Sequence, residues 1–162
     1  MEPMLTDDTP PLLRHALATL AYRAAKVVRS APPDFATFSA GEGARSPAEI
    51  LAHIGDLLDW ALGLADGRHT WGNSAPLPWD DEIERCFACL ARLDARLASH
   101  RPVCPPEQLF QGPIADALAH VGQIALLRRL AGSPVRGENY FRAGIEPGRV
   151  GRDQPSPGAE FD

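Results

Sequence analysis

The sequence predicts an all-α fold, a four-helix bundle formed by a single domain over residues 1–162. The first observation is the distribution of the residues that break helices, 16 prolines and 14 glycines among 162 residues. Four long windows hold no proline and only three of the glycines; they cover residues 12–30, 48–66, 80–100 and 114–131. The second observation is that apolar residues in each window recur at the three- and four-residue spacing of a helix with one buried face. Such helices bury these faces against one another, which favours a bundle over a β-sandwich or barrel.

The first two helices have clear start and stop signals. The first is expected to follow Thr9-Pro10, because threonine followed by proline is typical of a helix start, and to end before Pro32. The second should begin at the capping box Ser46-Pro47-Ala48-Glu49. There the serine oxygen accepts a hydrogen bond from a free amide, and Glu49 reaches back to the serine amide. Gly67 suits the left-handed conformation that commonly ends a helix.

The last two helices and the tail complete the expected fold. The third helix should start near Pro78-Trp79-Asp80-Asp81, where acidic side chains meet the positive end of the helix dipole. The fourth should open at Gly112-Pro113 and close at Gly132. Residues 133–162 show no helical period, so we expect an irregular tail that packs on the bundle core of residues 10–132 with a few aromatic side chains tucked in. The end of this tail is a candidate for disorder.

Composition excludes several classes of protein. The net charge of −5 disfavours a nucleic-acid or anionic-membrane surface. No apolar run reaches the roughly 18 residues of a membrane helix, and the first residues do not form a secretory signal. Three cysteines are too few for a disulfide scaffold, so a cytoplasmic, reduced protein is expected. Cys86 and Cys89 form a C-x-x-C pair inside the third helix, where small buried side chains are a better interpretation than zinc ligands; Cys104 is read as a loop thiol.

Polar residues interrupt the apolar faces of the second and fourth helices. Asp116, His120 and Gln123 follow one another at helical spacing, so they share one side of the fourth helix beside its apolar stripe. His53 lies on the apolar side of the second helix. We therefore expect both helices to direct imidazoles into the bundle interior. Gly122, next to this stripe, suggests a point of close helix approach.

Two interpretations of these residues are open. In the first, His53, Asp116 and His120 bind one metal ion as a two-histidine, one-carboxylate set, with positions left for water or substrate. Gln123 would then orient a bound water or hold a ligand in place. In the second, the same residues form a hydrogen-bonded cluster without metal. Spacing alone favours the second, because an aspartate four residues before a histidine is a common coincidence.

Aromatic and arginine side chains are further candidates for a substrate pocket. An aromatic rim around the metal end could be formed by Trp60, Trp71, Trp79, Tyr140 and Phe141. Simple core packing is the alternative, and the favoured one, for Trp60. Arg128, Arg129 and Arg136 could hold an anionic substrate or thiol cofactor, because arginine binds carboxylates bidentately. A solvated helix end is the alternative and the favoured interpretation.

Two segments resemble the DinB/YfiT-like family. The segment 116–132 is similar to the last bundle helix of that family, where a histidine-x-x-x-histidine pair followed by x-Gly-Gln supplies two metal ligands. The segment 46–54 is similar to the second helix, whose histidine is the remaining ligand and matches His53. Asp116 stands where the family has the first histidine of its pair, and His120 matches the second. The resemblance extends over most of residues 10–132.

The resemblance implies a four-helix bundle around a divalent metal (zinc, nickel, manganese or iron) and often a homodimer. Characterised members include S-transferases and isomerases that use a low-molecular-weight thiol such as bacillithiol or mycothiol. The expected function is thus metal-dependent transfer or hydrolysis on a small-molecule substrate, with a thiol as a candidate cofactor. The sequence identifies no general base. Two alternatives are a metal-free bundle that binds a small apolar ligand and a dimeric structural or regulatory module.

Overall fold

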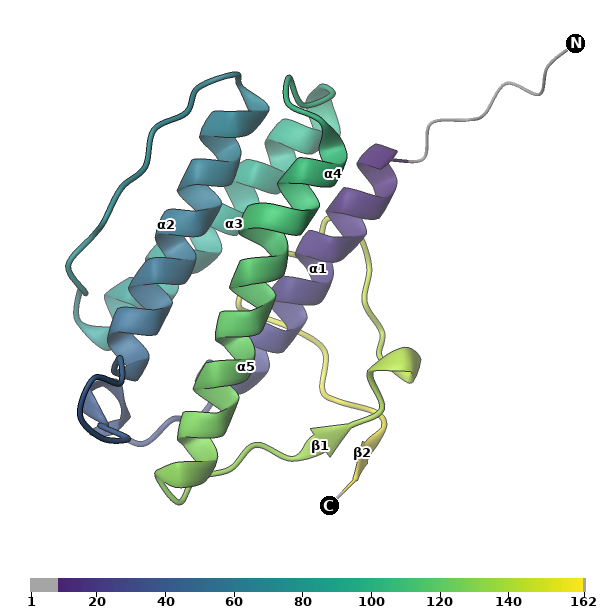
Figure 1. Cartoon of the computed structure of the whole chain (residues 1–162). Helices are drawn as coiled ribbons and strands as arrows, with labels where there is room; N and C mark the ends of the chain where they lie inside the picture. Colours follow the sequence, from purple (N-terminus) through teal and green to yellow (C-terminus); the bar gives the residue numbers. More distant parts are fainter. Residues whose placement is uncertain (1–8, 162) are drawn as a thin grey trace, which may run out of the picture.

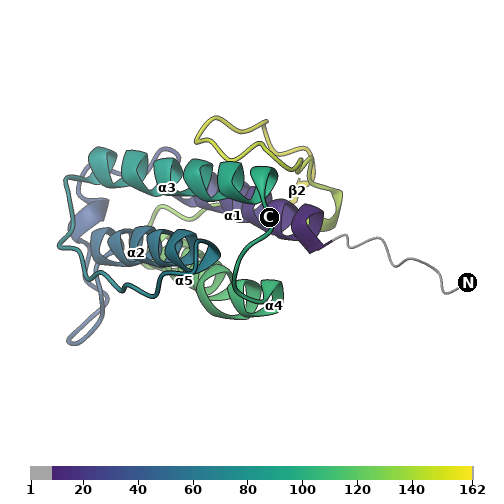
Figure 2. The same ribbon diagram turned by 90° about the horizontal axis from the view of Figure 1, so that it is seen from above.

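The computed structural model describes residues 9–161, which contain four long helices packed side by side (Figure 1). These helices are α1 Thr9–Val28, α2 Pro47–Ala65, α3 Trp79–Ser99 and α5 Ala115–Leu130. Around the bundle they follow the order α1, α3, α2, α5, so that α1 and α3 form one layer and α2 and α5 the other (Figure 2). The predicted four-helix arrangement is confirmed at this level. Within residues 9–161, no helix combines the length and apolar character needed to cross a lipid bilayer.

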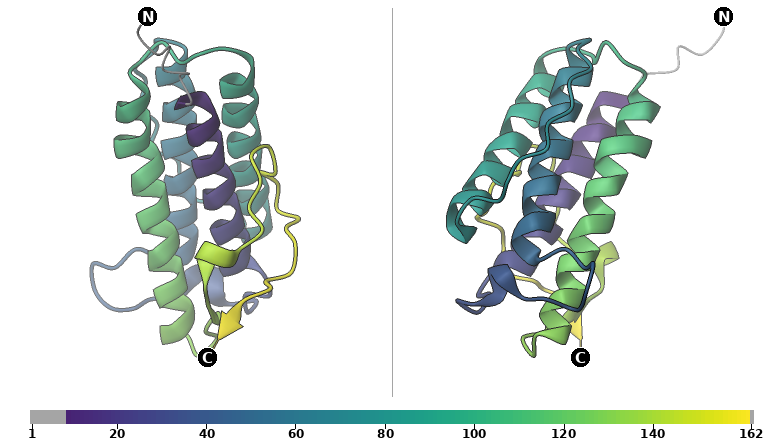
Figure 3. Two further views of the ribbon diagram at one scale, coloured as in Figure 1. Left: turned by 90° about the vertical axis from the view of Figure 1, so that its right-hand side faces the viewer. Right: turned by 60° about the vertical axis from the view of Figure 1, so that its left-hand side comes forward.

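Helices α2 and α3 run in the same direction. Three ion pairs follow one another in the same order along both helices: Asp56 with Arg85, Asp59 with Arg92, and Asp66, directly after α2, with Arg96. The connector 66–78 must therefore return along the length of α2, as the views in Figures 1 and 3 show. Ser74 anchors this connector, because its backbone amide and its hydroxyl both donate to the Asp56 carboxylate, at 2.8 and 2.7 Å.

Local signals at the helix ends explain most of the boundaries. The capping box is present, since Ser46 N donates to Glu49 Oε2 at 2.7 Å and Glu49 N donates to Ser46 Oγ at 3.3 Å. Beyond α2, Gly67 adopts a φ of +78°, which a glycine reaches without steric cost. The predicted starts of the first three helices are confirmed.

The predicted start of the fourth helix is wrong. The helix begins earlier, as α4 Pro106–Leu109, passes through a π-helical turn at Phe110–Ile114 (η2) and continues as α5. Pro113 thus lies inside the helix instead of opening it. A proline has no N–H to donate and its ring crowds the preceding turn, and the wide π-helical turn accommodates both effects. The predicted end is confirmed, because Gly132 has a φ of +77°.

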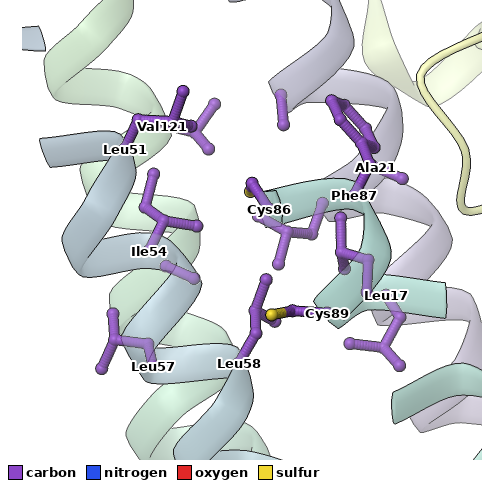
Figure 4. Close-up of a cluster of buried hydrophobic side chains, with 14 of the residues drawn as sticks. Leu17, Ala21, Leu51, Ile54, Leu57, Leu58, Cys86, Phe87, Cys89 and Val121 are labelled. Atoms are coloured by element: carbon purple, nitrogen blue, oxygen red, sulfur yellow. The ribbon is translucent and has the colours of Figure 1, made fainter. Parts of the chain in front are cut away.

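The core lies between the two helix layers and contains two of the cysteines (Figure 4). Cys86 and Cys89 are 0% and 1% exposed and lie among leucine and isoleucine side chains such as Ile54 and Leu58. Burial raises the pKa of the Cys86 thiol to about 12. Both residues are therefore small buried side chains, as predicted; Cys104 is partly exposed, and all three thiols are free.

The segment after α5 crosses the α1 and α3 layer and returns (Figures 2 and 3). It contains β1 Gly137–Glu138, the short helix η3 Tyr140–Arg142 and β2 Glu160–Phe161. The two strands pair antiparallel, with Gly137 opposite Phe161. Val150 is 7% exposed and joins the hydrophobic core, so this segment packs on the bundle.

One expectation for this segment is wrong. Its end is not disordered up to Phe161, because β2 pairs with β1 and Glu160 forms an ion pair with Lys26 of α1 at 3.2 Å. The expected packing of a few aromatic side chains is limited to Tyr140, which is partly buried against Tyr22, since Phe141 is 98% and Phe161 55% exposed. Charge pairs and this aromatic contact hold this part of the chain on the bundle.

Candidate metal centre

Two imidazoles and a carboxylate converge where α2 and α5 lie side by side. Oδ2 of Asp116 lies 3.9 Å from Nε2 of His53, and Oδ1 lies 3.5 Å from Nε2 of His120. One ligand atom from each residue lies within 4.8 Å of the other two. Ligand atoms held at about 2.1 Å from one ion lie roughly 3.0 to 3.4 Å apart, so small side-chain movements would complete a site. The structure thus brings together the three residues that the sequence proposed as ligands.

The three side chains lie at the flank of the bundle and not in its interior. Their exposed fractions are 19% for His53, 13% for His120 and 50% for Asp116. The inward positions of α5 are taken by Ala117 and Ile124, both 0% exposed. Asp116 and His120 are therefore turned away from the core and toward His53 of α2. The expected central location is corrected, and the new location leaves the carboxylate open to solvent.

Gln123 orients the ring of His120. The Nδ1 of His120 lies 2.9 Å from Oε1 of Gln123. An amide oxygen only accepts hydrogen bonds, so Nδ1 is the donor in this contact and Nε2 is the nitrogen that faces Asp116. A metal bound at Nε2 requires the proton to be on Nδ1, which this contact favours. The position of Gln123 agrees with its predicted role of holding a ligand in place.

The connector 66–78 adds aromatic side chains beside His53. The ring centroid of Trp71 lies 5.7 Å from that of His53, and Trp60 lies 5.6 Å from Trp71. His69 extends the row at 5.6 Å from Trp60. Trp60, a sequence candidate for the pocket, is thus one ring removed from His53, and Trp71 is the side chain in contact.

Tyr140 is not near this group. Its ring packs edge-on against Tyr22 of α1, with 6.3 Å between centroids, and the guanidinium of Arg23 lies 3.8 Å above it. The segment that carries Tyr140 crosses the α1 and α3 layer, whereas the three metal-ligand candidates belong to α2 and α5, which form the other layer (Figure 2). The prediction of Tyr140 as a pocket residue is therefore not supported by its position.

Two of the three arginines proposed from the sequence serve other contacts, and the third, Arg129, is exposed. Arg128 is 4% exposed and donates from Nη1 to the carbonyl oxygens of Val27 and Arg29, at 2.8 and 3.0 Å. It thereby satisfies the end of α1, where helix carbonyls lack partners. Arg136 lies 3.7 Å from Glu160.

An open pocket of about 380 Å³ adjoins the group on the side of the α2 N-terminus. Most of its wall is apolar and includes Ile50, Leu126 and Leu127. Its polar wall contains His120, Gln123 and Arg45. Arg45 was missed at the sequence level, although its place directly before the capping box of the His53 helix could have suggested it.

The pKa of His53 is lowered from its usual value. Burial is the largest cause, followed by the charges of His120 and Arg45, while Asp116 and Asp56 act in the opposite direction. A lowered pKa keeps the imidazole neutral over a wider pH range, and the neutral form is the one that binds metal.

We expect two substitutions to move this pKa in opposite directions. Arg45→Gln removes a positive charge and should raise the pKa of His53, whereas Asp116→Asn removes a negative charge and should lower it further. An NMR titration of the His53 ring protons in metal-free protein measures both. A pKa of His53 that falls in Arg45→Gln, or rises in Asp116→Asn, would contradict this account of its electrostatics.

Comparison of the chain with family models, with curated proteins and with solved structures gave no match. The DinB/YfiT-like resemblance of the α2 and α5 sequences therefore remains an expectation. Function must be inferred from the three converging side chains and the pocket beside them.

Proposed function

We propose that this chain is a divalent-metal-dependent enzyme of the DinB-like kind that carries out transfer or hydrolysis on a small molecule. The observation that supports it is the convergence of His53, Asp116 and His120 within 4.8 Å from two different helices. Chance pairs of this type arise on one helix, but a third matching ligand from a neighbouring helix is a stronger indication.

The donor set fits a catalytic metal. Two imidazoles and one carboxylate suit zinc, nickel, manganese or iron, and three protein ligands leave coordination positions for other molecules. When bound, the ion would act as a Lewis acid and lower the pKa of a thiol or water in an open position. The half-exposed Asp116 and the adjoining pocket provide access to that position.

The surrounding residues have separate roles in this proposal. Gln123 orients the ring of His120 and favours the proton on its Nδ1. Trp71 covers one side of His53 and limits the approach of water from there. The pocket beside His120 holds the substrate. A low-molecular-weight thiol as cofactor and a homodimer belong to the proposal through the family resemblance alone.

Metal analysis of the purified protein tests the proposal. We expect one divalent ion per chain after incubation with zinc, nickel, manganese or iron and desalting, measured by inductively coupled plasma mass spectrometry. His53→Ala should lose the ion, while His15→Ala, which removes an exposed imidazole on α1, should keep it. A wild-type protein that stays metal-free would refute the proposal and favour the metal-free ligand-binding bundle. Consumption of thiol with electrophilic substrates then tests the transferase form of the loaded protein.

A further inference from the structure

The pocket beside His120 presents hydrogen-bond donors and no acidic side chain. Because Oε1 of Gln123 accepts from His120, the amide nitrogen of Gln123 remains as a donor. The guanidinium of Arg45 is the second donor, and it always carries a positive charge. The remaining wall is apolar. A ligand that fits this wall has a hydrogen-bond acceptor at one end and an apolar body.

Arg45 is available for a ligand. Among residues 9–161, no carboxylate is close enough to Arg45 to form an ion pair with it. The arginines that join α2 to α3, in contrast, are all paired with aspartates. The nearby Glu49 is engaged by the amide of Ser46 in the capping box. That same box fixes the backbone directly after Arg45, so its guanidinium is presented from a defined point at the start of α2.

Charge and volume limit the class of ligand. Of the residues that the structure describes, Arg45 is the one arginine, lysine or carboxylate side chain in the pocket wall, so an anion is favoured there without any metal. A divalent ion on two neutral histidines and one aspartate would add a further net positive charge. One guanidinium and one amide suit a monoanionic carboxylate, which arginine binds bidentately. Phosphate groups are usually held by more donors, such as the amides of a helix start or a glycine-rich loop. The 380 Å³ volume lies at the lower end of the range for small-molecule sites.

We propose that this pocket binds a small carboxylate, with Arg45 and Gln123 holding the carboxylate group and Leu126 and Leu127 packing against a short apolar body. This proposal rests on the proposed function in one respect, because it names the substrate class of the same site. Binding itself needs the pocket and not the metal. Arg45 is therefore a specificity-determining residue, placed beside His120 but not among the ligands.

Binding can be measured without metal in the background of His53→Ala, because His53 does not line the pocket. We expect an NMR titration of this variant to show that hexanoate binds more tightly than hexylammonium or inorganic phosphate. Arg45→Gln should weaken hexanoate binding by roughly fivefold or more, the loss of a charge-assisted hydrogen bond. Arg142→Gln removes an equal charge from an exposed position outside the pocket and should leave affinity unchanged.

The apolar wall is tested separately. Affinity should rise roughly threefold for each methylene added between butanoate and hexanoate, because each buries more apolar surface. Leu126 is 55% exposed, so Leu126→Trp should fill the pocket and abolish binding without unfolding the protein, which circular dichroism checks. Equal hexanoate affinity in Arg45→Gln, equal binding of hexylammonium, or no detectable binding would each overturn the proposal. If metal analysis fails while these results hold, the pocket stands and only the metalloenzyme proposal falls.

Discussion

Metal affinity is expected to fall by more than about a hundredfold when His120 is replaced with alanine, and by roughly 10- to 100-fold when Gln123 is replaced with leucine. The first change removes a ligand. The second removes only the acceptor that keeps Nδ1 of His120 protonated and its ring in place. Competition against a chromophoric chelator measures both affinities under the same conditions.

Gly122→Ala is the matched control. Gly122 lies between His120 and Gln123 in the sequence, but its position on the helix is exposed. A Cβ added there meets no atom within 4 Å, so the predicted close approach of helices at Gly122 is wrong. We expect unchanged metal affinity and a free energy of unfolding higher by about 0.5–1 kcal/mol, since alanine is the better helix former. If Gln123→Leu lost metal as completely as His120→Ala, Gln123 would itself be a ligand. If neither changed affinity, the metal would lie elsewhere.

Local signals made the helices and the three ligand candidates predictable. The capping box and the glycine after α2 act within one turn of the chain, so their geometry follows from neighbouring residues alone. Asp116 and His120 share a helix face by their spacing, and His53 needed only the assumption that α2 and α5 are neighbours. Pro113 misled the prediction because a proline that usually opens a helix lies here in a π-helical turn.

The surroundings of the site depend on chain direction, which spacing does not reveal. Trp71 reaches His53 only because α2 and α3 run parallel and the connector returns along α2. Tyr140 lies far from the group because its segment crosses the other helix layer. Arg45 lines the pocket because α5 is antiparallel to α2 and brings Leu126 and Leu127 beside it. These contacts depend on the tertiary arrangement of the helices, and no local sequence pattern indicates them.

The sequence did not predict a buried cluster of charged side chains around Glu138. Disrupting this cluster is the second change with a large expected effect, here on stability. Lys26, the only lysine of the chain, donates from Nζ to Oε2 of Glu138 at 2.8 Å, and the hydroxyl of Tyr22 donates to Oε1. The side chain of Glu138 is 0% exposed and that of Lys26 6%. We expect Glu138→Ala to lower the free energy of unfolding by about 3–5 kcal/mol, because it leaves a buried ammonium with the partly exposed Glu160 as its remaining partner.

Urea denaturation measures this loss, and two further variants show its origin. Glu146→Ala removes an exposed glutamate of the same segment, one that pairs with Arg149, and should change stability by less than about 0.5 kcal/mol. The double replacement Lys26→Met, Glu138→Leu should recover most of the stability, because it leaves no unpaired buried charge. A Glu138→Ala protein as stable as wild type would contradict the cluster, as would a double variant no better than the single one.

The pH dependence of stability gives the same cluster an independent signature. Burial and the bond to Glu138 raise the pKa of Tyr22; burial opposes the charged form of Lys26, but its bonds to Glu138 and Glu160 outweigh this and raise its pKa as well. Above about pH 10 the unfolded chain therefore releases protons that the folded chain retains, so the free energy of unfolding falls as pH rises. The stability contributed by Tyr22 and Lys26 is fully present below about pH 10 and is lost as the pH rises through the pKa values of these groups in the folded protein. Glu138→Ala removes the main partner of both Tyr22 and Lys26. We therefore expect the stability of this variant to decline less than that of wild type between about pH 9 and 11. An equal decline in the two proteins would show that Glu138 does not hold these protons.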